Sequence, residues 1–258
     1  IIFTNIFFRH INYIRNKTIS ILNNQINCKF YGISVTNSSS CKIEGNTIRN
    51  FRSSLNSSIY NEEFSSIAIR NSRKITVAQN ILVDDFNGMF IRNSDSIELN
   101  QNQINSHFGS GLYILNTDIM NIKNCSLKYN GMHGIYSIDS SVLNVSHNYL
   151  YQNSLGGIWM YGDFLNSIFN NTVKENDGPG FFGSSLSNIS MINNKFGANL
   201  YDGSRFMSCG HLTISRNIFS DNTYSGIYFA LSGSIYFYNN TLIGNNQYGL
   251  HNLSSTFF

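Results

Sequence analysis

A glycine recurs every 23 residues through most of this chain, and no other feature of the sequence constrains the fold as strongly. The series is Gly88, Gly111, Gly134, Gly157, Gly180, Gly203, Gly226 and Gly249. It extends backwards to Ser66 and Gly32, with steps of 22 and 34 residues. A repeat of this length predicts a solenoid, in which each unit packs mainly on its two neighbours.

Two columns of asparagine run in register with the glycines. The first lies 14 residues after each member of the series, from Asn46 to Asn240, with Cys125 interrupting it, and Asn24 continues it 14 residues after His10. The second lies four residues before the glycine, from Asn130 to Asn245. We expect these side chains to turn inward at bends, where stacked amides bond to one another and to the backbone. We also expect a left-handed backbone at the asparagines and a tight bend at the glycines.

Apolar residues alternate within each unit, in three short stretches. Examples are Ile158 and Met160, Ile189 and Met191, and the single residue Val173 two positions after an asparagine. A period of two is typical of strands, and no stretch shows a sustained helical period. Each unit therefore predicts three short strands separated by turns.

The fold predicted from these patterns is an all-β, parallel β-helix of about ten coils of 22–23 residues. It forms a single domain over residues 1–258, which we interpret as a segment of a longer protein, with an inserted loop at 52–64. A leucine-rich repeat is the rival, because Ile97-x-Leu99-x-x-Asn102 fits its core pattern. The second alternating stretch of each unit argues against it, since a leucine-rich repeat needs a helical segment there.

One unit shows a resemblance to a known family. The run from Asn148 through Asn153 and Gly157 to Met160 resembles the right-handed parallel β-helix repeat of the pectin-lyase-like superfamily, which includes NosD-type and carbohydrate-binding sugar-hydrolase modules. The resemblance extends from His10 to His251 and implies the fold directly. It implies function only broadly, because the superfamily holds polysaccharide lyases, hydrolases, epimerases, phage tailspikes and non-catalytic extracellular repeats.

The composition excludes several classes of protein. Charged residues make up 12% of the chain, 40 residues are asparagine, and the net charge is +3. This charge is too small for strong phosphate binding, so we expect no nucleic-acid partner. No run of 18 apolar residues predicts a membrane span. The four cysteines show no metal-ligand spacing, so we expect buried free thiols and neither a metal nor a cofactor.

One outward column is unusual for a protein surface. Two residues after the glycine, it carries the aromatic residues Phe90, Tyr113, Tyr136, Trp159, Phe182 and Tyr228. Arg70 and Arg92 lie on the same face, and the corresponding column of the next strand is polar. We predict that these eight residues form an exposed binding face, with rings that stack on a glycan or contact a partner protein. The alternative is that the rings only stack on one another between coils.

Catalytic signals are weaker than this binding signal. Asp95 and Asp118 share a column, with Asp139 and Asp163 in the same turn and Asp84 and Asp85 before the strand, but no complete catalytic motif surrounds them. We therefore predict a non-catalytic binding or adhesion scaffold, extracellular or at the cell surface, with a polysaccharide or an extracellular protein as partner. The alternatives are a polysaccharide-active enzyme using the same face, and a structural spacer in a large cell-surface or junctional protein.

Overall fold

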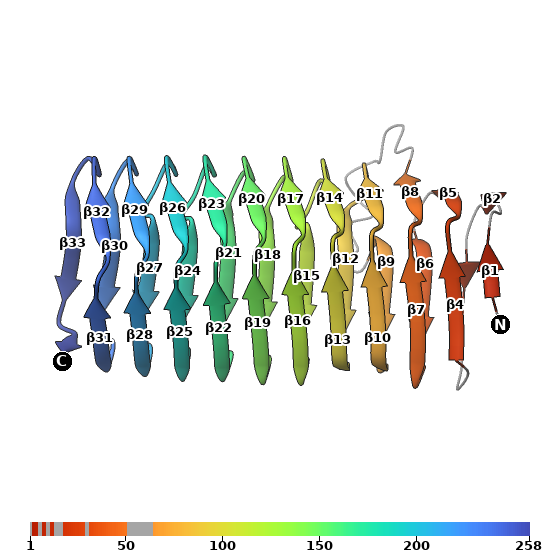
Figure 1. Cartoon of the computed structure of the whole chain (residues 1–258), viewed down its shortest axis with the longest axis horizontal. Coiled ribbons are helices and arrows are strands. Elements are labelled where there is room, and N and C mark those ends of the chain that lie inside the picture. The colour runs from red at the N-terminus through yellow and green to blue at the C-terminus, as the bar shows by residue number, and fades with distance from the viewer. Residues whose placement is uncertain (1, 5–6, 9–10, 13–17, 29–30, 51–63) are drawn as a thin grey trace, which may run out of the picture.

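The computed structural model describes residues 2–4, 7–8, 11–12, 18–28, 31–50 and 64–258, which form a β-solenoid of about ten coils. Three parallel sheets run along its length (Figure 1). The described residues hold strands and turns and no helix, so they offer no apolar helix of the length that a bilayer crossing needs. The inserted loop predicted at 52–64 lies, apart from Phe64, outside the described residues.

Each coil contributes one strand to each of the three sheets. Sheet A consists of β1 (Ile2–Thr4), β4 (Thr18–Leu22), β7 (Ser40–Glu44), β10 (Arg73–Ala78), β13 (Asp95–Asn100), β16 (Ile119–Lys123), β19 (Val142–Ser146), β22 (Leu165–Phe169), β25 (Asn188–Ile192), β28 (His211–Ser215), β31 (Ser234–Tyr238) and β34 (Thr256–Phe257). Sheet B consists of β2 (Phe7–Phe8), β5 (Gln25–Cys28), β8 (Thr47–Asn50), β11 (Ile81–Val83), β14 (Gln103–Asn105), β17 (Ser126–Lys128), β20 (Tyr149–Tyr151), β23 (Thr172–Lys174), β26 (Lys195–Gly197), β29 (Ile218–Ser220) and β32 (Thr241–Ile243). Sheet C consists of β3 (Ile11–Asn12), β6 (Tyr31–Thr36), β9 (Ser65–Arg70), β12 (Asn87–Arg92), β15 (Leu112–Leu115), β18 (His133–Ile138), β21 (Gly156–Tyr161), β24 (Phe181–Ser184), β27 (Ser204–Met207), β30 (Ser225–Ala230) and β33 (Tyr248–Leu253).

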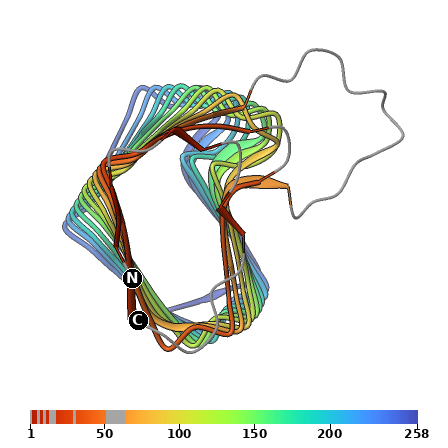
Figure 2. The ribbon, with the colours of Figure 1, turned by 90° about the vertical axis from the view of Figure 1, so that its right-hand side faces the viewer.

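The pairing register repeats from coil to coil and confirms the strands predicted from the period of two. In sheet C, for example, Ile135 pairs with Leu112 on one side and with Ile158 on the other. Viewed from the end of the solenoid, successive coils nearly superimpose (Figure 2). Equivalent residues therefore form straight rows along the axis, about 4.8 Å apart.

The predicted apolar columns fill the interior. Ile135, Ile158, Met191 and Val173 are each at most 1% exposed and belong to one continuous core. Cys41, Cys125 and Cys209 are buried free thiols, as expected, while the side chain of Cys28 lies outside the described residues. Burial raises the pKa of the Cys125 thiol to about 11, which keeps it protonated and unreactive.

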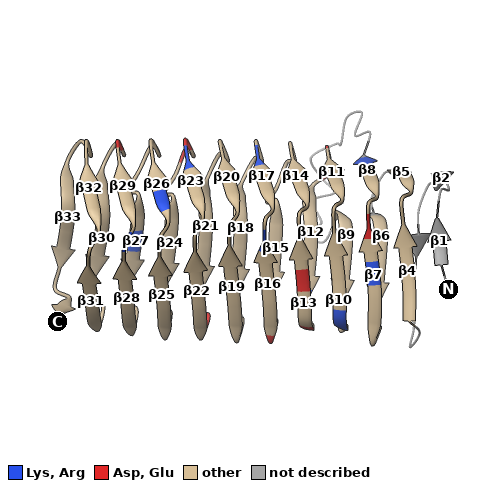
Figure 3. Cartoon of the chain, in the orientation of Figure 1, with Lys and Arg blue, Asp and Glu red and all other residues tan. Residues whose placement is uncertain are grey.

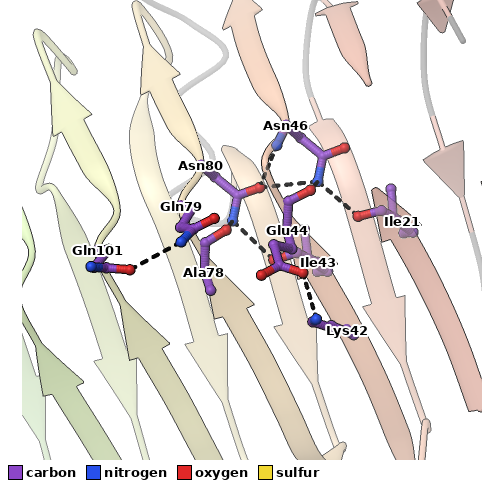
Figure 4. A network of polar contacts seen from close by, with 9 residues as sticks. All are labelled: Ile21, Lys42, Ile43, Glu44, Asn46, Ala78, Gln79, Asn80 and Gln101. Carbon is purple, nitrogen blue, oxygen red and sulfur yellow. Dashed lines mark hydrogen bonds and ion pairs between the residues drawn. The ribbon is translucent and has the colours of Figure 1, made fainter. Parts of the chain in front are cut away.

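The asparagine columns form the predicted inward ladders. Asn171 receives a hydrogen bond from the backbone N–H of Asn148 at 2.9 Å, and its amide donates to Asn194 Oδ1 at 3.0 Å and to the Val145 carbonyl at 2.8 Å. Figure 4 shows the same pattern between Asn46 and Asn80. Each amide thus satisfies buried backbone groups at a corner and links two coils.

Two non-asparagine residues extend or interrupt these ladders. Cys125 accepts from Asn102 Nδ2 at 3.8 Å, and its own N–H donates to Asn148 Oδ1 at 2.8 Å. His107 stands at the head of the second ladder, where its N–H donates to Asn130 Oδ1. The ring nitrogen His107 Nδ1 accepts from the Asp85 N–H. Burial lowers the pKa of His107 to about 4, so the ring is neutral near pH 7.

The left-handed backbone does not occur at the inward asparagines, contrary to our expectation. It occurs one residue earlier, as at Asn170 (φ 54°), His147 (φ 57°) and Arg216 (φ 57°). The residue before each inward position turns the corner, and the asparagine then returns to a conformation that aims its side chain at the interior. Where the structure describes a whole coil, the coil has three such corners, one between each pair of sheets.

The glycine column forms no regular bend: Gly111, Gly180 and Gly203 lie at bends, but the other described glycines of the column lie inside strands of sheet C. Gly157 lies inside strand β21, and a Cβ atom there would approach Val173 Cγ1 to 2.2 Å and the Gly180 carbonyl oxygen to 2.5 Å. Gly134 is similarly enclosed. The column therefore requires glycine because the interior has no room for a side chain beside the asparagine ladder.

Polar side chains interrupt the core in two adjacent coils. Ser137, Asp163 and Asn166 are at most 4% exposed, and they replace the apolar or serine residues of their columns. Asp163 Oδ1 accepts from the Ser140 N–H at 2.6 Å and from Ser137 Oγ at 3.3 Å. Asp163 Oδ2 and both polar atoms of Asn166 have no hydrogen-bond partner. Burial raises the pKa of Asp163 to about 7, so this carboxyl group is only partly ionised at neutral pH.

Candidate ligand-binding face

The outward column of sheet C brings the predicted aromatic residues into one row. Backbone pairing places Phe90 beside Tyr113, Tyr113 beside Tyr136, Tyr136 beside Trp159, and Trp159 beside Phe182. We call these five residues the aromatic ladder. Arg205 follows Phe182 in the row and separates the ladder from Tyr228.

The ladder rings stack on one another. The centroids of Tyr113 and Tyr136 are 5.1 Å apart, with 2° between the ring planes. Phe90 stacks on Tyr113 at 5.7 Å, and Trp159 stacks on Phe182 at 3.8 Å. Offset stacking of this kind stabilises each pair by about 0.5–1.5 kcal/mol beyond the area that it buries.

This stacking changes what the face can offer to a ligand. Phe90 is 1% exposed and is not part of an exposed surface, contrary to the prediction. Tyr113, Tyr136, Trp159 and Phe182 are half-buried. Because the stacked ring faces contact neighbouring rings, a ligand meets mainly ring edges, the tyrosine hydroxyl groups and the indole. Binding by these residues stays a prediction, but the expected stacking of sugar rings on open ring faces is not available between stacked coils.

His133 completes the ladder between Tyr136 and Trp159. It opens strand β18, is 7% exposed, and lies 5.4 Å from the Tyr136 centroid and 5.0 Å from the Trp159 centroid. Burial lowers the pKa of His133 to about 4, so the imidazole is neutral near pH 7, and its Nδ1 has no hydrogen-bond partner.

Arginines lie at both ends of the row. The Arg70 guanidinium lies 5.2 Å from the Phe90 centroid, and Arg92 is paired with Arg70 at the end of the neighbouring strand, where it is exposed. Arg205 lies 4.2 Å from the centroid of Tyr228 and 5.3 Å from that of Tyr201. Cation–π contacts of this kind restrain the guanidinium groups beside the rings.

Asp202 is a carboxylate of this face that the sequence reasoning missed. It is 2% exposed; its Oδ2 lies 3.6 Å from Arg205 Nε, and its Oδ1 accepts from the Ser225 N–H at 2.9 Å. Burial raises the pKa of Asp202, and Arg205 opposes this shift. Its signal in the sequence was its column, one residue before the glycine, which also holds His133.

Exposed apolar side chains border the face on both sides. The turns before the sheet C strands carry Phe108, Met132, Leu155, Leu200 and Tyr224. The ends of these strands and the turns after them carry Tyr161, Phe164, Met207 and Leu231. The face is therefore a half-buried aromatic row between apolar margins, with arginines at its ends.

The aspartates considered as catalytic candidates are not gathered in one site, although two of them line the same trough. Asp85 and Asp163 are fully buried, and Asp163 points into the core. Asp95 and Asp118 line a trough of about 480 Å³ at the corner between sheets C and A. Among the described residues, no group of three His, Cys, Asp or Glu side chains is placed to hold a metal ion.

Comparisons with known proteins agree with this architecture. Residues 110–257 match the family described as right handed beta helix region, and residues 6–156 match the family described as periplasmic copper-binding protein (NosD). No curated protein matches the chain. The NosD description implies copper, but the described residues do not fit a copper site, since their cysteines lie in separate coils and no cluster of ligands surrounds them.

Solved structures of the same fold share little sequence with this chain. A periplasmic alginate epimerase, AlgG with two substitutions, has 10% identity and a TM-score of 0.63, over 93% of this chain and 77% of that chain. The enzymatically active domain of a tailspike of bacteriophage CBA120 has 9% identity and a TM-score of 0.59, over 97% and 42%. PfbA, a surface adhesin of Streptococcus pneumoniae, has 11% identity and a TM-score of 0.57, over 96% and 84%. These likenesses show the fold.

Proposed function

Because this chain belongs to the right-handed β-helix family, we propose that it is a non-catalytic binding scaffold whose aromatic ladder contacts an extended polysaccharide. One observation carries the proposal: the half-buried row of ring edges, hydroxyl groups and guanidinium groups on sheet C, repeated at the spacing of the coils. A linear glycan along the axis would receive hydrogen bonds from Tyr113 and Tyr136 and from the arginines at the ends. An extracellular or periplasmic location is consistent with this role, with the periplasmic NosD family and with the surface adhesin PfbA.

Trp159 provides a direct test, because it is the only tryptophan of the chain. We expect its fluorescence to change when a binding polysaccharide is added from a panel of neutral and acidic polymers. Tyr113→Phe should weaken binding about as much as Tyr113→Ala if the hydroxyl group is the contact. The matched control is Thr76→Ala on the polar face of sheet A. If no polysaccharide perturbs Trp159, or if both Tyr113 variants bind normally, the ladder is not a glycan-binding surface. Protection of Trp159 by an added protein would favour a protein partner instead.

The second candidate is a polysaccharide-active enzyme, and the Asp202–Arg205 pair favours it. A buried carboxyl group with a raised pKa, held beside an arginine and two tyrosines, is the kind of group that exchanges protons in catalysis. Release of unsaturated or reducing ends from a polysaccharide that binds, abolished by Asp202→Asn, would establish the enzyme. Without such release, the non-catalytic proposal stands.

A further inference from the structure

The corner between sheets C and A contains a trough that is separate from the aromatic ladder. At the described corners of the N-terminal coils, the middle residue points inward and the residues on either side of it point outward. The inward residues of the N-terminal coils include Ser38, Ser72 and Ser94, each 3% exposed. Two outward rows therefore stand on either side of an inward row, and they enclose a trough of about 480 Å³. This volume is in the range of pockets that hold small ligands.

One wall of the trough is a row of amides. Asn37, Asn71 and Asn93 line it, and all three have the left-handed backbone of the corner, with φ of 52°, 49° and 48°. Asn93 Nδ2 donates to Asn71 Oδ1, and Asn116 Nδ2 donates to Asn93 Oδ1, both at 3.4 Å. An amide has two donor hydrogens and an oxygen with two lone pairs, so each retains capacity for a ligand.

The opposite wall is charged. Arg73 and Asp95 open strands β10 and β13 and are paired in the sheet, and Asp118 follows one coil further on. Figure 3 shows blue at the start of β10 and red at the start of β13. Asp95 Oδ1 is shielded from solvent and has no hydrogen-bond partner. This wall carries two carboxylates, on successive coils, and one arginine. A hydrogen-bond donor from a ligand in the trough would therefore stabilise the carboxylates.

The floor of the trough does not compete for a ligand. The backbone N–H groups of Arg73, Asp95 and Asp118 donate to the carbonyl groups of Ser38, Ser72 and Ser94, each at 2.9 Å. The lining consists of Asn, Ser, Arg and Asp side chains, with no apolar or aromatic residue. The trough therefore offers a ligand planar polar groups, each of which can form hydrogen bonds to two neighbouring hydroxyl groups at once.

We propose that this corner trough is a second binding site, for a short saccharide or another ligand with many hydroxyl groups. Asp95 and Asp118 accept from its hydroxyl groups, Arg73 donates, and the amides of Asn71 and Asn93 do both. The inference goes beyond the ladder proposal and does not depend on it, because different residues on a different part of the surface carry it.

Calorimetric titration with cellotriose, mannotriose and xylotriose tests the site. We expect at least one triose to bind, and Asp95→Asn and Asn93→Ser each to weaken it about tenfold, as for one lost hydrogen bond to a charged or planar polar group. The control is Asp177→Asn, an identical change at an exposed carboxylate near another corner. Asp118→Asn serves as the second trough variant if Asp95→Asn unfolds.

The ladder variant Tyr113→Ala separates this inference from the proposed function. It should leave triose binding unchanged, and the trough variants should leave the Trp159 response to polysaccharide unchanged. Equal binding of the trioses by the wild-type protein and the trough variants would overturn the proposal. Absence of binding by all three trioses at millimolar concentration would also overturn the proposal. It would do so even if calcium alone raised the melting temperature of the protein.

Discussion

Replacing the buried carboxylate Asp163 by serine should make the protein more stable, and more so at alkaline pH. Burial raises the pKa of this group from 3.8 to about 7, so the folded state holds its proton more tightly than the unfolded state does. The stability linked to this proton is complete below about pH 4 and is lost as the pH rises towards 7. The folded and unfolded pKa values of Asp163 differ by about three, which corresponds to about 4 kcal/mol of lost stability at pH 8.

Serine is the commonest residue of this inward column, as at Ser72 and Ser94. The N–H of Ser38 donates to Ser72 Oγ at 3.1 Å, and the N–H of Ser72 donates to Ser94 Oγ at 3.2 Å. In Asp163→Ser, the new hydroxyl group can accept from the Ser140 N–H in the same way. The variant thus keeps the backbone hydrogen bond and removes the buried charge.

Urea unfolding followed by far-UV circular dichroism at pH 5, 6, 7 and 8 measures the effect. We expect Asp163→Ser to gain stability over the wild type as the pH rises, by about 2–4 kcal/mol between pH 5 and pH 8. The buried histidines titrate in both proteins, so the difference isolates Asp163. The control Asp177→Ser, at an exposed site, should change stability by less than about 0.5 kcal/mol. A difference that does not vary with pH, or a variant less stable than the wild type at pH 8, would refute the reasoning.

Three further predictions concern other parts of the fold. Burial lowers the pKa of His107 and of His133 to about 4, so the unfolded state binds more protons than the folded state between pH 6.5 and 4. The protein should therefore lose stability as the pH falls through this range, and His133→Phe should reduce the loss in urea titrations. Asn171→Ala should cost about 1–3 kcal/mol in the same assay, because it leaves buried backbone groups unpaired; an unchanged urea midpoint would contradict this. Gly157→Ala should destabilise the protein by about 1–3 kcal/mol or prevent folding. Gly249→Ala should be tolerated, because its Cβ atom would come no closer than 3.5 Å to Leu242. Equal thermal stability of the two variants would show that the glycine column is not needed for space.

The repeat made most of the fold predictable. Each position of the unit recurs about ten times, so the inward orientation of Ile158, Ile189 or Val173 follows from its whole column and not from one residue. The ladder of Asn171 was predictable for the same reason. The breaks at Asp163 and Asn166 were visible too, because they replace the serine and apolar residues that neighbouring coils carry at those positions.

The corners were less predictable because their chemistry varies. The left-handed position before the inward asparagine is itself asparagine in several coils, as at Asn124 and Asn170, but Gln101, His147 and Arg216 hold it in others, so composition marks it only in part. The inward position one residue later is asparagine in every described coil except at Cys125, and this constancy drew the backbone assignment to the wrong residue. The glycine column misled in a similar way, since a requirement for space and a requirement for a bend select the same residue.

The binding face was predictable as a row but not as a surface. The column showed which residues stack, whereas the exposure of each depends on ring orientation and on neighbours outside the column. His133 enters the row from a neighbouring position, and Phe90 is buried. Neither fact follows from the alternation of inward and outward residues along a strand.

The uniform spacing of the coils also sets a condition on any polymer that lies along the solenoid. Each outward row offers the same kind of contact at an advance of about 4.8 Å. A stiff chain whose own repeat equals this advance can make one contact again on every coil. A chain whose repeat differs by about a tenth is out of step by half a spacing after about five coils, so its later units face the gaps between contacts. Commensurate length alone, without any specific pocket, would then discriminate between polymers that carry the same chemical groups.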